Sequence, residues 1–393
     1  MSMESADRDV TITDVQTAKL DSEFEWTLVR VYTDAGVAGT GEAVLAPGAA
    51  AYVEHLRGRL VGRDPLQIDA ILTRLFDGNA HLGAMSGVGV AAVSAIDIAL
   101  HDLAGKLLGV PAHQLLGGSH RDTVRVYCDC HAGDHLYDAE GDDDYTPAAY
   151  ADAAEEVLAE GFDAVKFDLD GPTPHDGDRR NRHLNANAID HKAEIVEAVT
   201  ERVGDRADVA FDCHWSWTSD SVRRLSRAIA DFDVWWLEDP VPPENHDLQI
   251  DVATDVDVTI AAGENAYRIE GARRLIENGG VDVFHPDVPK TGGMYETKKV
   301  ANLAKAYAVP VALHNVASPL GTMASAHVAA SVSNFLALEY HAHGDPEWGS
   351  LIEESPLEDG HIILPDAPGL GVQLDEAAVT ERLVDGETPL DPA

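Results

Sequence analysis

The chain has 393 residues, of which 28 are basic and 69 acidic, so its formal net charge at pH 7 is −41. A surface of this charge repels phosphate backbones, which argues against nucleic acid as a partner. No run of 18 or more apolar residues is present, which argues against a membrane span. Because the acidic residues are scattered among periodic apolar positions, the composition predicts a halophilic protein whose charge is screened by molar salt; acidic disordered segments such as 140–144 are the alternative.

The first residues and the cysteines bear on localisation. Residues 1–10 have neither a basic segment nor an apolar core, so no secretory signal is predicted. The cysteines, Cys128, Cys130 and Cys213, are odd in number and lack a CxxC zinc pattern. We therefore expect a cytoplasmic protein in a reducing compartment.

In chain order, residues 10–45 are typical of strands and turns and residues 49–108 of helices, which predicts an α+β domain over residues 1–120. From there on, short apolar runs that end in a polar residue alternate with helical stretches. The eight runs begin at Val124, Ala164, Val209, Val234, Val258, Val281, Val309 and Phe335. Eight such units predict a (β/α)8 barrel over residues 121–355, and residues 356–393 resume short strands that should return to the first domain.

Polar residues end the later apolar runs at intervals of 23 to 27 residues. They are Asp212, Glu238, Glu264, Asp287, His314 and Glu339. In a barrel of this type, functional groups lie at the carboxyl ends of the strands. A single carboxylate there is more often a helix cap, but the first three residues together offer hard oxygen ligands that suit Mg²⁺.

Two histidines lie beside these carboxylates. On a strand, residues i and i+2 share a face, so His214 should point into the same cavity as Asp212, with Cys213 packed in the barrel wall. Asp287 should hold the His314 imidazole and raise its proton affinity. Two imidazoles around a cation indicate a general base and a general acid, although a lone strand-end histidine is more often a hydrogen-bonded structural residue.

Several stretches of the chain together carry a family resemblance. They are Ala91–Gly118, Trp236–Pro240 (W-L-E-D-P), Ala261–Asn265 (A-A-G-E-N), His285–Met294 and Leu364–Val372. With them the chain resembles the mandelate racemase-like branch of the enolase superfamily. The resemblance implies an α/β fold, a modified TIM barrel (β/α)7β with an α+β capping domain that the C-terminal segment completes. It also implies a homo-oligomer, either a dimer or an octamer.

The resemblance further implies a chemistry, namely removal of a proton next to a carboxylate, with the resulting enediolate stabilised by Mg²⁺. The positions that match the family's metal ligands are Asp212, Glu238 and Glu264. Asp287 and His314 match its Asp–His dyad. Glu339 matches a glutamic acid that donates a hydrogen bond to the enediolate.

One departure from the family pattern decides the subgroup. Racemases of the branch often carry Lys-x-Lys on the second barrel strand, whereas this chain has Lys166-x-Asp168. Asp212-x-His214 on the third strand instead resembles acid-sugar dehydratases of the galactonate and mannonate type. By this resemblance His214 removes the α-proton, and His314 protonates the leaving β-hydroxide to give a 2-keto-3-deoxy acid.

Further residues are expected to contact the substrate, an aldonate or aldarate. They are Lys166, Asp168 and Asn315, with an ion pair between Lys166 and Asp168 as the alternative for that lysine. The loop 170–187 is long for its position and is predicted to be a lid or binding loop, or else a solvated loop. By family analogy, residues 21–26 form a second cover over the substrate.

Three other functions compete with dehydration. A racemase or epimerase of a 2-hydroxy acid on the same metal site is the nearest. A cycloisomerase usually needs a lysine where Asp287 stands. A catalytically silent binding protein fits poorly, since every metal and dyad position is occupied.

Overall fold

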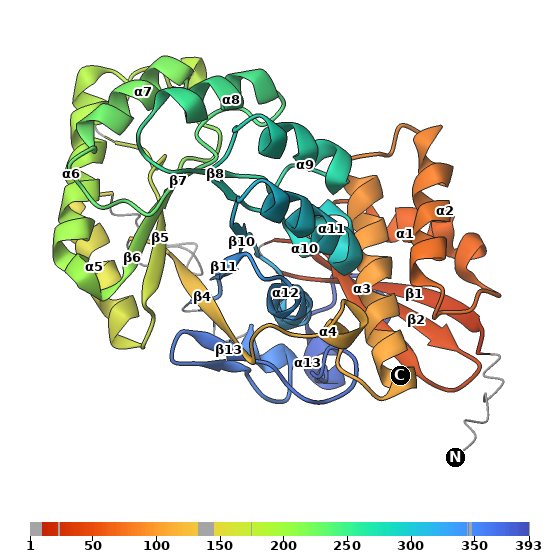
Figure 1. The fold of residues 1–393 in the computed structure, drawn as a ribbon. Helices are drawn as coiled ribbons and strands as arrows, with labels where there is room; N and C mark the ends of the chain where they lie inside the picture. Colours follow the sequence, from red (N-terminus) through yellow and green to blue (C-terminus); the bar gives the residue numbers. More distant parts are fainter. Residues whose placement is uncertain are drawn as a thin grey trace.

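The computed structural model describes residues 10–22, 24–132, 145–173, 175–343, 345 and 348–392, so the acidic run 140–144 lies outside the described residues. Figure 1 shows a body of sheet and helices beside a barrel of strands with helices around it. The predicted fold class, a (β/α)7β barrel with an α+β capping domain, is confirmed. The boundaries at residues 120 and 355 stay a prediction.

The capping domain contains a three-stranded antiparallel sheet covered by helices. Its elements are β1 (Ile12–Leu20), β2 (Trp26–Thr33), β3 (Ala38–Ala43), α1 (Ala49–Leu60), α2 (Ile68–Ala80), α3 (Val88–Leu108) and α4 (Ala112–Leu115). Helix α3 lies directly on β3, because the strand presents glycine to it. A Cβ atom at Gly39 would lie 2.2 Å from the Ala99 carbonyl oxygen, and one at Gly41 would lie 2.1 Å from that of Ala95. The two glycines therefore permit the close approach of the backbones.

By length and composition α3 is able to cross a membrane, but 94% of its most apolar window is buried inside the protein. The helix also carries buried polar side chains, and His101 Nδ1 lies 3.2 Å from Asp97 Oδ1. It is the core helix of the capping domain.

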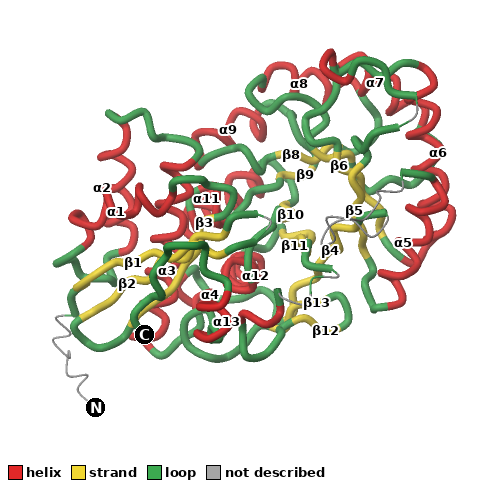
Figure 2. The backbone as a smooth tube through the Cα atoms, turned by 180° about the vertical axis from the view of Figure 1, so that it is seen from behind, coloured by secondary structure: helices red, strands yellow, loops and turns green. Residues whose placement is uncertain are grey.

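The barrel strands coincide with the eight predicted apolar runs, and β4 and β6 each begin one residue before their run. They are β4 (Thr123–Cys130), β5 (Ala164–Asp168), β6 (Asp208–Asp212), β7 (Leu237–Glu238), β8 (Ile260–Ala262), β9 (Val283–Phe284), β10 (Val311–Leu313) and β11 (Phe335–Tyr340). Neighbouring strands are parallel, and β11 pairs with β4 to close the ring, as Figure 2 shows from behind. The helices between them are α5 (Pro147–Ala159), α6 (Ala186–Val203), α7 (Ser219–Ala228), α8 (His246–Asp255), α9 (Arg268–Glu277), α10 (Val288–Thr291), α11 (Gly293–Ala306) and α12 (Pro319–Ser331).

Strand alternation builds two layers inside the barrel. The floor is a cluster of buried side chains, one from each strand except that Trp236 lies just before β7: Tyr127, Ala164, Ala210, Trp236, Ala261, Val283, Ala312 and Ala337. Two residues further along a strand, the side chain points to the same face again. On seven of the strands that residue is titratable, and these residues are Asp129, Lys166, Asp212, Glu238, His285, His314 and Glu339. A ring of ionisable groups therefore lies above an apolar floor.

The C-terminal segment contacts both parts of the chain. Its elements are β12 (Leu357–Glu358), β13 (His361–Ile363) and α13 (Glu376–Glu381). Three short 3₁₀ helices lie earlier in the described chain: η1 (Arg179–Asn181), η2 (Gly204–Arg206) and η3 (Gly349–Leu351). Strand β13 pairs antiparallel with β4 of the barrel. Further on, Leu383 forms a bridge with Leu20, and the Asp391 carbonyl accepts a hydrogen bond of 2.9 Å from Arg30. The segment thus extends from the barrel to the capping sheet.

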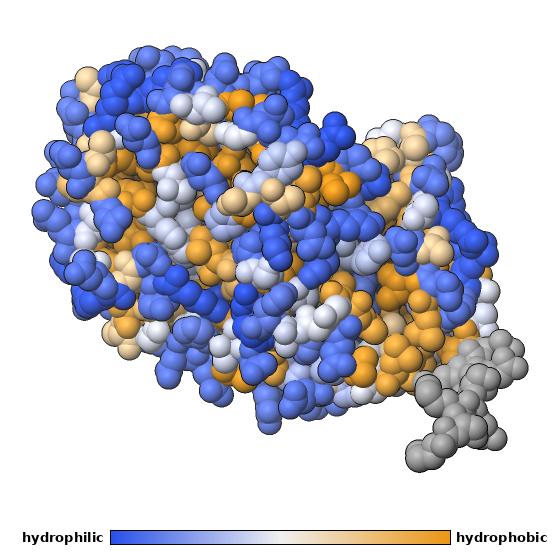
Figure 3. All heavy atoms as spheres, viewed as in Figure 1, coloured by the Kyte–Doolittle hydropathy of each residue, from blue (hydrophilic) through white to orange (hydrophobic). Residues whose placement is uncertain are grey.

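The surface is strongly hydrophilic. Figure 3 shows polar side chains over much of the visible face. Because 69 acidic residues face only 28 basic ones, most surface carboxylates have no basic partner available, and their mutual repulsion depends on the ionic strength.

Candidate active site

The three predicted metal ligands lie buried at the carboxyl ends of adjacent strands. Asp212 and Glu238 end β6 and β7 in register with each other, and Glu264 follows β8 after Gly263. Carboxylate oxygens of Glu238, Glu264 and the neighbouring Asp239 all lie within 4.8 Å of one another. Asp212 belongs to a second such group with Asp168 and His214. The structure therefore joins the predicted ligands in two groups rather than one.

The ammonium group of Lys166 links these two groups. Its Nζ atom lies 3.2 Å from both Asp212 Oδ2 and Glu238 Oε1, and 2.6 Å from Glu339 Oε1. Burial disfavours the ammonium ion, but these carboxylates together hold the pKa of Lys166 well above its usual value. Lys166 therefore pairs across the barrel lumen, and the alternative ion pair with Asp168 is not formed.

The donor set fits a divalent cation. Asp212, Glu238 and Glu264 are hard oxygen donors, and Lys290 Nζ, 3.0 Å from Glu264 Oε1, is the second ammonium group of this region. Asp239 Oδ2 is buried and accepts no hydrogen bond from a described residue, and burial next to Glu264 raises the pKa of Asp239 well above its usual value. A divalent cation bound between these carboxylates would offset negative charge that the two ammonium groups leave.

The predicted Asp–His dyad forms at the ends of β9 and β10. His314 Nδ1 lies 2.7 Å from Asp287 Oδ2, and its Nε2 lies 2.6 Å from Glu264 Oε2. Burial favours the neutral imidazole, but the charges of Glu264 and Glu339 and the hydrogen bond to Asp287 raise the pKa of His314 well above its usual value. A protonated His314 is what an acid that protonates a leaving group requires.

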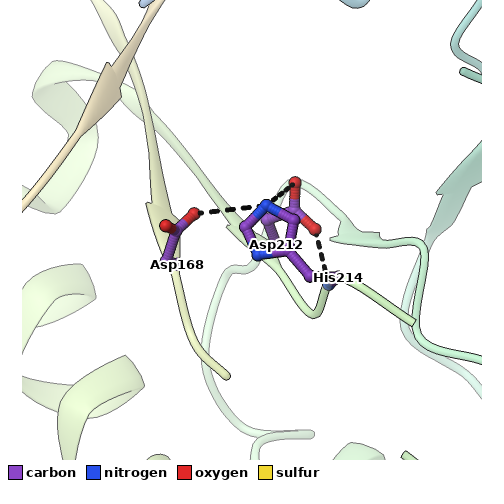
Figure 4. Close-up of side chains that lie close together, drawn as sticks. All are labelled: Asp168, Asp212 and His214. Carbon is purple, nitrogen blue, oxygen red and sulfur yellow. Dashed lines mark hydrogen bonds and ion pairs between the residues drawn. The ribbon is translucent and has the colours of Figure 1, made fainter. Parts of the chain in front are cut away.

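His214 lies beside Asp212, although not for the reason that strand alternation suggests. Strand β6 ends at Asp212, and His214 and Trp215 adopt left-handed backbone angles, with φ of 39° and 56°. The imidazole Nε2 nevertheless lies 3.5 Å from Asp212 Oδ2 and 3.9 Å from Asp168 Oδ1, as Figure 4 shows. The charge of Asp212 raises the pKa of His214 to about 11. Cys213 is buried in the wall, as predicted.

A cavity of about 760 Å³ lies next to His214. The loop 170–187 contributes much of its lining, with Asp170, Asp176, Gly177, Arg179, Arg182, His183 and Leu184. A second cavity of about 270 Å³ borders the same imidazole and also contacts Asp168. The loop therefore lines the candidate active site. In the segment 21–26, the Phe24 ring packs 5.1 Å from that of His341, just past β11.

Comparison with known proteins places these features in a family. Residues 8–117 match the model described as mandelate racemase / muconate lactonizing enzyme, N-terminal domain, and residues 149–378 match enolase C-terminal domain-like. The chain belongs to this family of the enolase superfamily.

Relatives of this chain are similar to it over nearly the whole length of both proteins. The D-xylonate dehydratase of Haloferax volcanii is 54% identical over 386 residues, which cover 98% of this chain and 92% of that protein. The D-galactonate dehydratase of Ralstonia nicotianae is 30% identical over 91% of each chain. The crystal structure of a mandelate racemase/muconate lactonizing enzyme-like protein from Rubrobacter xylanophilus is 37% identical, has a TM-score of 0.91 and covers 97% of this chain and 99% of its own. The predicted enzyme class, a lyase, is confirmed.

Within this family frame, some residues lie elsewhere than expected or were overlooked. Asn315 is buried, and its Nδ2 donates to Thr322 Oγ1 and to the Glu339 carbonyl oxygen, at 2.9 and 3.2 Å, so its role in substrate binding stays a prediction. Asp129, whose Oδ1 lies 3.9 Å from Lys166 Nζ, was not predicted. Its signal was its position two residues after Tyr127, the same spacing that separates Trp236 from Glu238. Lys290 and Asp239 were also not predicted, although both lie in the sequence stretches that carry the family resemblance.

Proposed function

We propose that this enzyme is a sugar-acid dehydratase that converts an aldonate or aldarate to a 2-keto-3-deoxy acid, with D-xylonate as the first candidate substrate. The observation that carries the proposal is the pair of imidazoles, one beside each of the two carboxylate groups that Lys166 links: His214 lies beside Asp212, and His314 lies beside Glu264. The two dehydratase relatives support the same reaction class.

In this proposal each residue has one task. Asp212, Glu238 and Glu264 would hold Mg²⁺, which stabilises negative charge on the substrate carboxylate when bound. His214 takes the proton from C2. A cation held by Asp212 would neutralise the charge of that carboxylate and so lower the pKa of His214 into the range of a base. Glu339, whose oxygens contact Lys166 and the Asn315 backbone N–H in this structure, would donate a hydrogen bond to the enediolate oxygen as a carboxylic acid. Lys166 and Asp168 would contact the substrate.

The second half of the reaction belongs to the dyad. The imidazolium of His314, held by Asp287, gives its proton to the hydroxyl on C3 as the C3–O bond breaks, so that water leaves. The enol that remains takes up a proton at C3 and becomes the 2-keto acid. Hydroxide is a poor leaving group, which is why a group with a raised pKa is suited to this position.

A substrate screen tests the proposal. The purified enzyme is incubated with a library of aldonates and aldarates, Mg²⁺ and molar KCl, and 2-keto products are detected with semicarbazide. The high salt follows from our proposal that a chain of net charge −41 is halophilic and cytoplasmic. A racemase or epimerase would exchange the C2 proton with solvent deuterium and invert C2 without forming a keto acid, and that result would replace dehydration. Light scattering in the same buffer tests the predicted homo-oligomer.

A further inference from the structure

A carboxylate outside the expected catalytic set contacts the His214 imidazole. Asp170, in the loop after β5, lies with Oδ1 3.0 Å from His214 Nδ1. The opposite ring nitrogen, Nε2, faces Asp212 and Asp168 on the side of the metal-ligand cluster. The two nitrogens of His214 thus have different surroundings. The arrangement parallels the pair of Asp287 and His314, in which the carboxylate also contacts Nδ1.

Asp170 is itself fixed by several contacts. Its Oδ2 accepts a hydrogen bond of 3.0 Å from Ser216 Oγ, and its backbone carbonyl accepts one of 2.7 Å from Arg179. The buried Lys192 of α6 donates to the carbonyl oxygens on both sides of Asp170, to that of Leu169 at 2.7 Å and to that of Gly171 at 3.2 Å. Both carbonyls that flank Asp170 are therefore bound to one ammonium group, which restrains the carboxylate position.

The backbone turns sharply at His214. The left-handed φ values of His214 and Trp215 turn the chain away from the strand direction, and non-glycine residues adopt them at a cost. The Asp170 carboxylate meets the imidazole in this turned position. Both residues also border the two cavities beside the site, so the pair lies where a substrate enters.

We propose that Asp170 is a positioning residue for the base. Its carboxylate accepts a hydrogen bond from the Nδ1–H group of His214 and so fixes the ring orientation, which leaves Nε2 to take the C2 proton of the substrate. The site then contains two Asp–His pairs, Asp170–His214 for proton removal and Asp287–His314 for loss of the hydroxyl. This assignment rests on the proposed dehydratase function for its kinetic consequence, but the contact itself is measurable without a substrate.

The first test therefore needs no substrate. Histidines are labelled with ¹⁵N, and the His214 resonance is assigned in the wild-type enzyme by its absence from His214→Asn. A proton held between Nδ1 and a carboxylate gives a strongly deshielded signal, which Asp170→Asn should lose, while Asp287→Asn should keep it. Persistence of the signal in Asp170→Asn would overturn the assignment, whatever reaction the enzyme catalyses.

The second test separates positioning from binding. Asp170→Asn should lower kcat by about 10²-fold, in the range found for groups that orient a ligand or a catalytic histidine, with KM little changed. Exchange of the C2 proton with solvent deuterium should fall in parallel. Asp287→Asn should instead lower keto-acid formation more than exchange. If exchange in Asp170→Asn equals that of the wild-type enzyme, Asp170 does not position the base. If the wild-type enzyme forms no keto acid from any sugar acid, the proposed dehydration fails while the NMR result still decides the contact.

Discussion

Replacement of Lys166 by Met tests the electrostatics of the barrel lumen. The change keeps the length of the side chain but removes an ammonium group that lies within 3.2 Å of Asp212, Glu238 and Glu339. Loss of one partner from a buried ion pair costs about 3–5 kcal/mol, because the remaining charge is left uncompensated. At about 2–4 °C per kcal/mol, that cost corresponds to a fall in Tm of roughly 6–20 °C.

The assay is differential scanning calorimetry in molar KCl, first with EDTA and then with saturating Mg²⁺. Since the cation and the ammonium group compensate the same carboxylates in our proposal, Mg²⁺ should raise the Tm of Lys166→Met more than that of the wild-type enzyme. Lys19→Met is the matched control. Lys19 Nζ lies 3.5 Å from Glu387 and the side chain is 34% exposed, so its loss should cost no more than about 1 kcal/mol.

Two results would refute this reasoning. Equal Tm values for Lys166→Met and Lys19→Met in EDTA would mean that the lumen carboxylates do not need the ammonium charge. Equal stabilisation of Lys166→Met and the wild-type enzyme by Mg²⁺ would mean that the cation binds elsewhere.

Three further changes test other parts of the structure. Glu238→Gln should abolish the Mg²⁺-dependent rise in Tm, and a rise equal to that of the wild-type enzyme would place the metal elsewhere. His314→Asn should lose keto-acid formation but retain exchange of the C2 proton with solvent; loss of both would assign His314 an additional role. Burial raises the pKa of Glu42 from 4.5 to about 7. Between pH 4.5 and 7 the folded enzyme therefore binds more protons than the unfolded chain, so the free energy of unfolding falls by about 3 kcal/mol as the pH rises across this range. Relative to Glu42→Gln, which does not titrate, the wild-type enzyme should lose that stability between pH 4.5 and 7 in calorimetric scans, and a constant difference would contradict the shift.

The barrel could be predicted because its signal is local and repeated. Each strand is a short apolar run, and one strand, one helix and two loops occupy a nearly constant length, so the ends of successive runs are visible in the sequence. The same regularity located Asp212, Glu238 and the dyad of Asp287 and His314, which lie 2.7 Å apart in the structure. Periodicity is therefore sufficient to assign a residue to a strand end.

Periodicity does not assign partners across the lumen. For Lys166 the sequence indicated substrate binding or, as the alternative, an ion pair with Asp168, two residues away, yet its partners Asp212 and Glu339 lie on β6 and β11. A strand projects residues i and i+2 side by side along one face, whereas the closed ring brings together side chains from strands that are distant in sequence. The turn at His214 was equally hidden, because a left-handed φ is signalled by glycine or asparagine, and neither is present there.

The stretch W-L-E-D-P shows how the two layers of the lumen depend on each other. Trp236 is part of the apolar floor, where alanines on five other strands leave room for its indole. Its Nε1 atom must donate a hydrogen bond when buried, and it donates to Glu238 Oε2, 3.1 Å away and two residues along the same strand. The opposite oxygen, Oε1, faces Lys166 at 3.2 Å. Burial favours the neutral carboxyl group, but the charge of Lys166 and next that of His285 hold the pKa of Glu238 below its usual value. One side chain of the floor thus donates a hydrogen bond to a candidate metal ligand and orients its carboxylate, so packing in the barrel and the proposed metal site are not independent features of this fold.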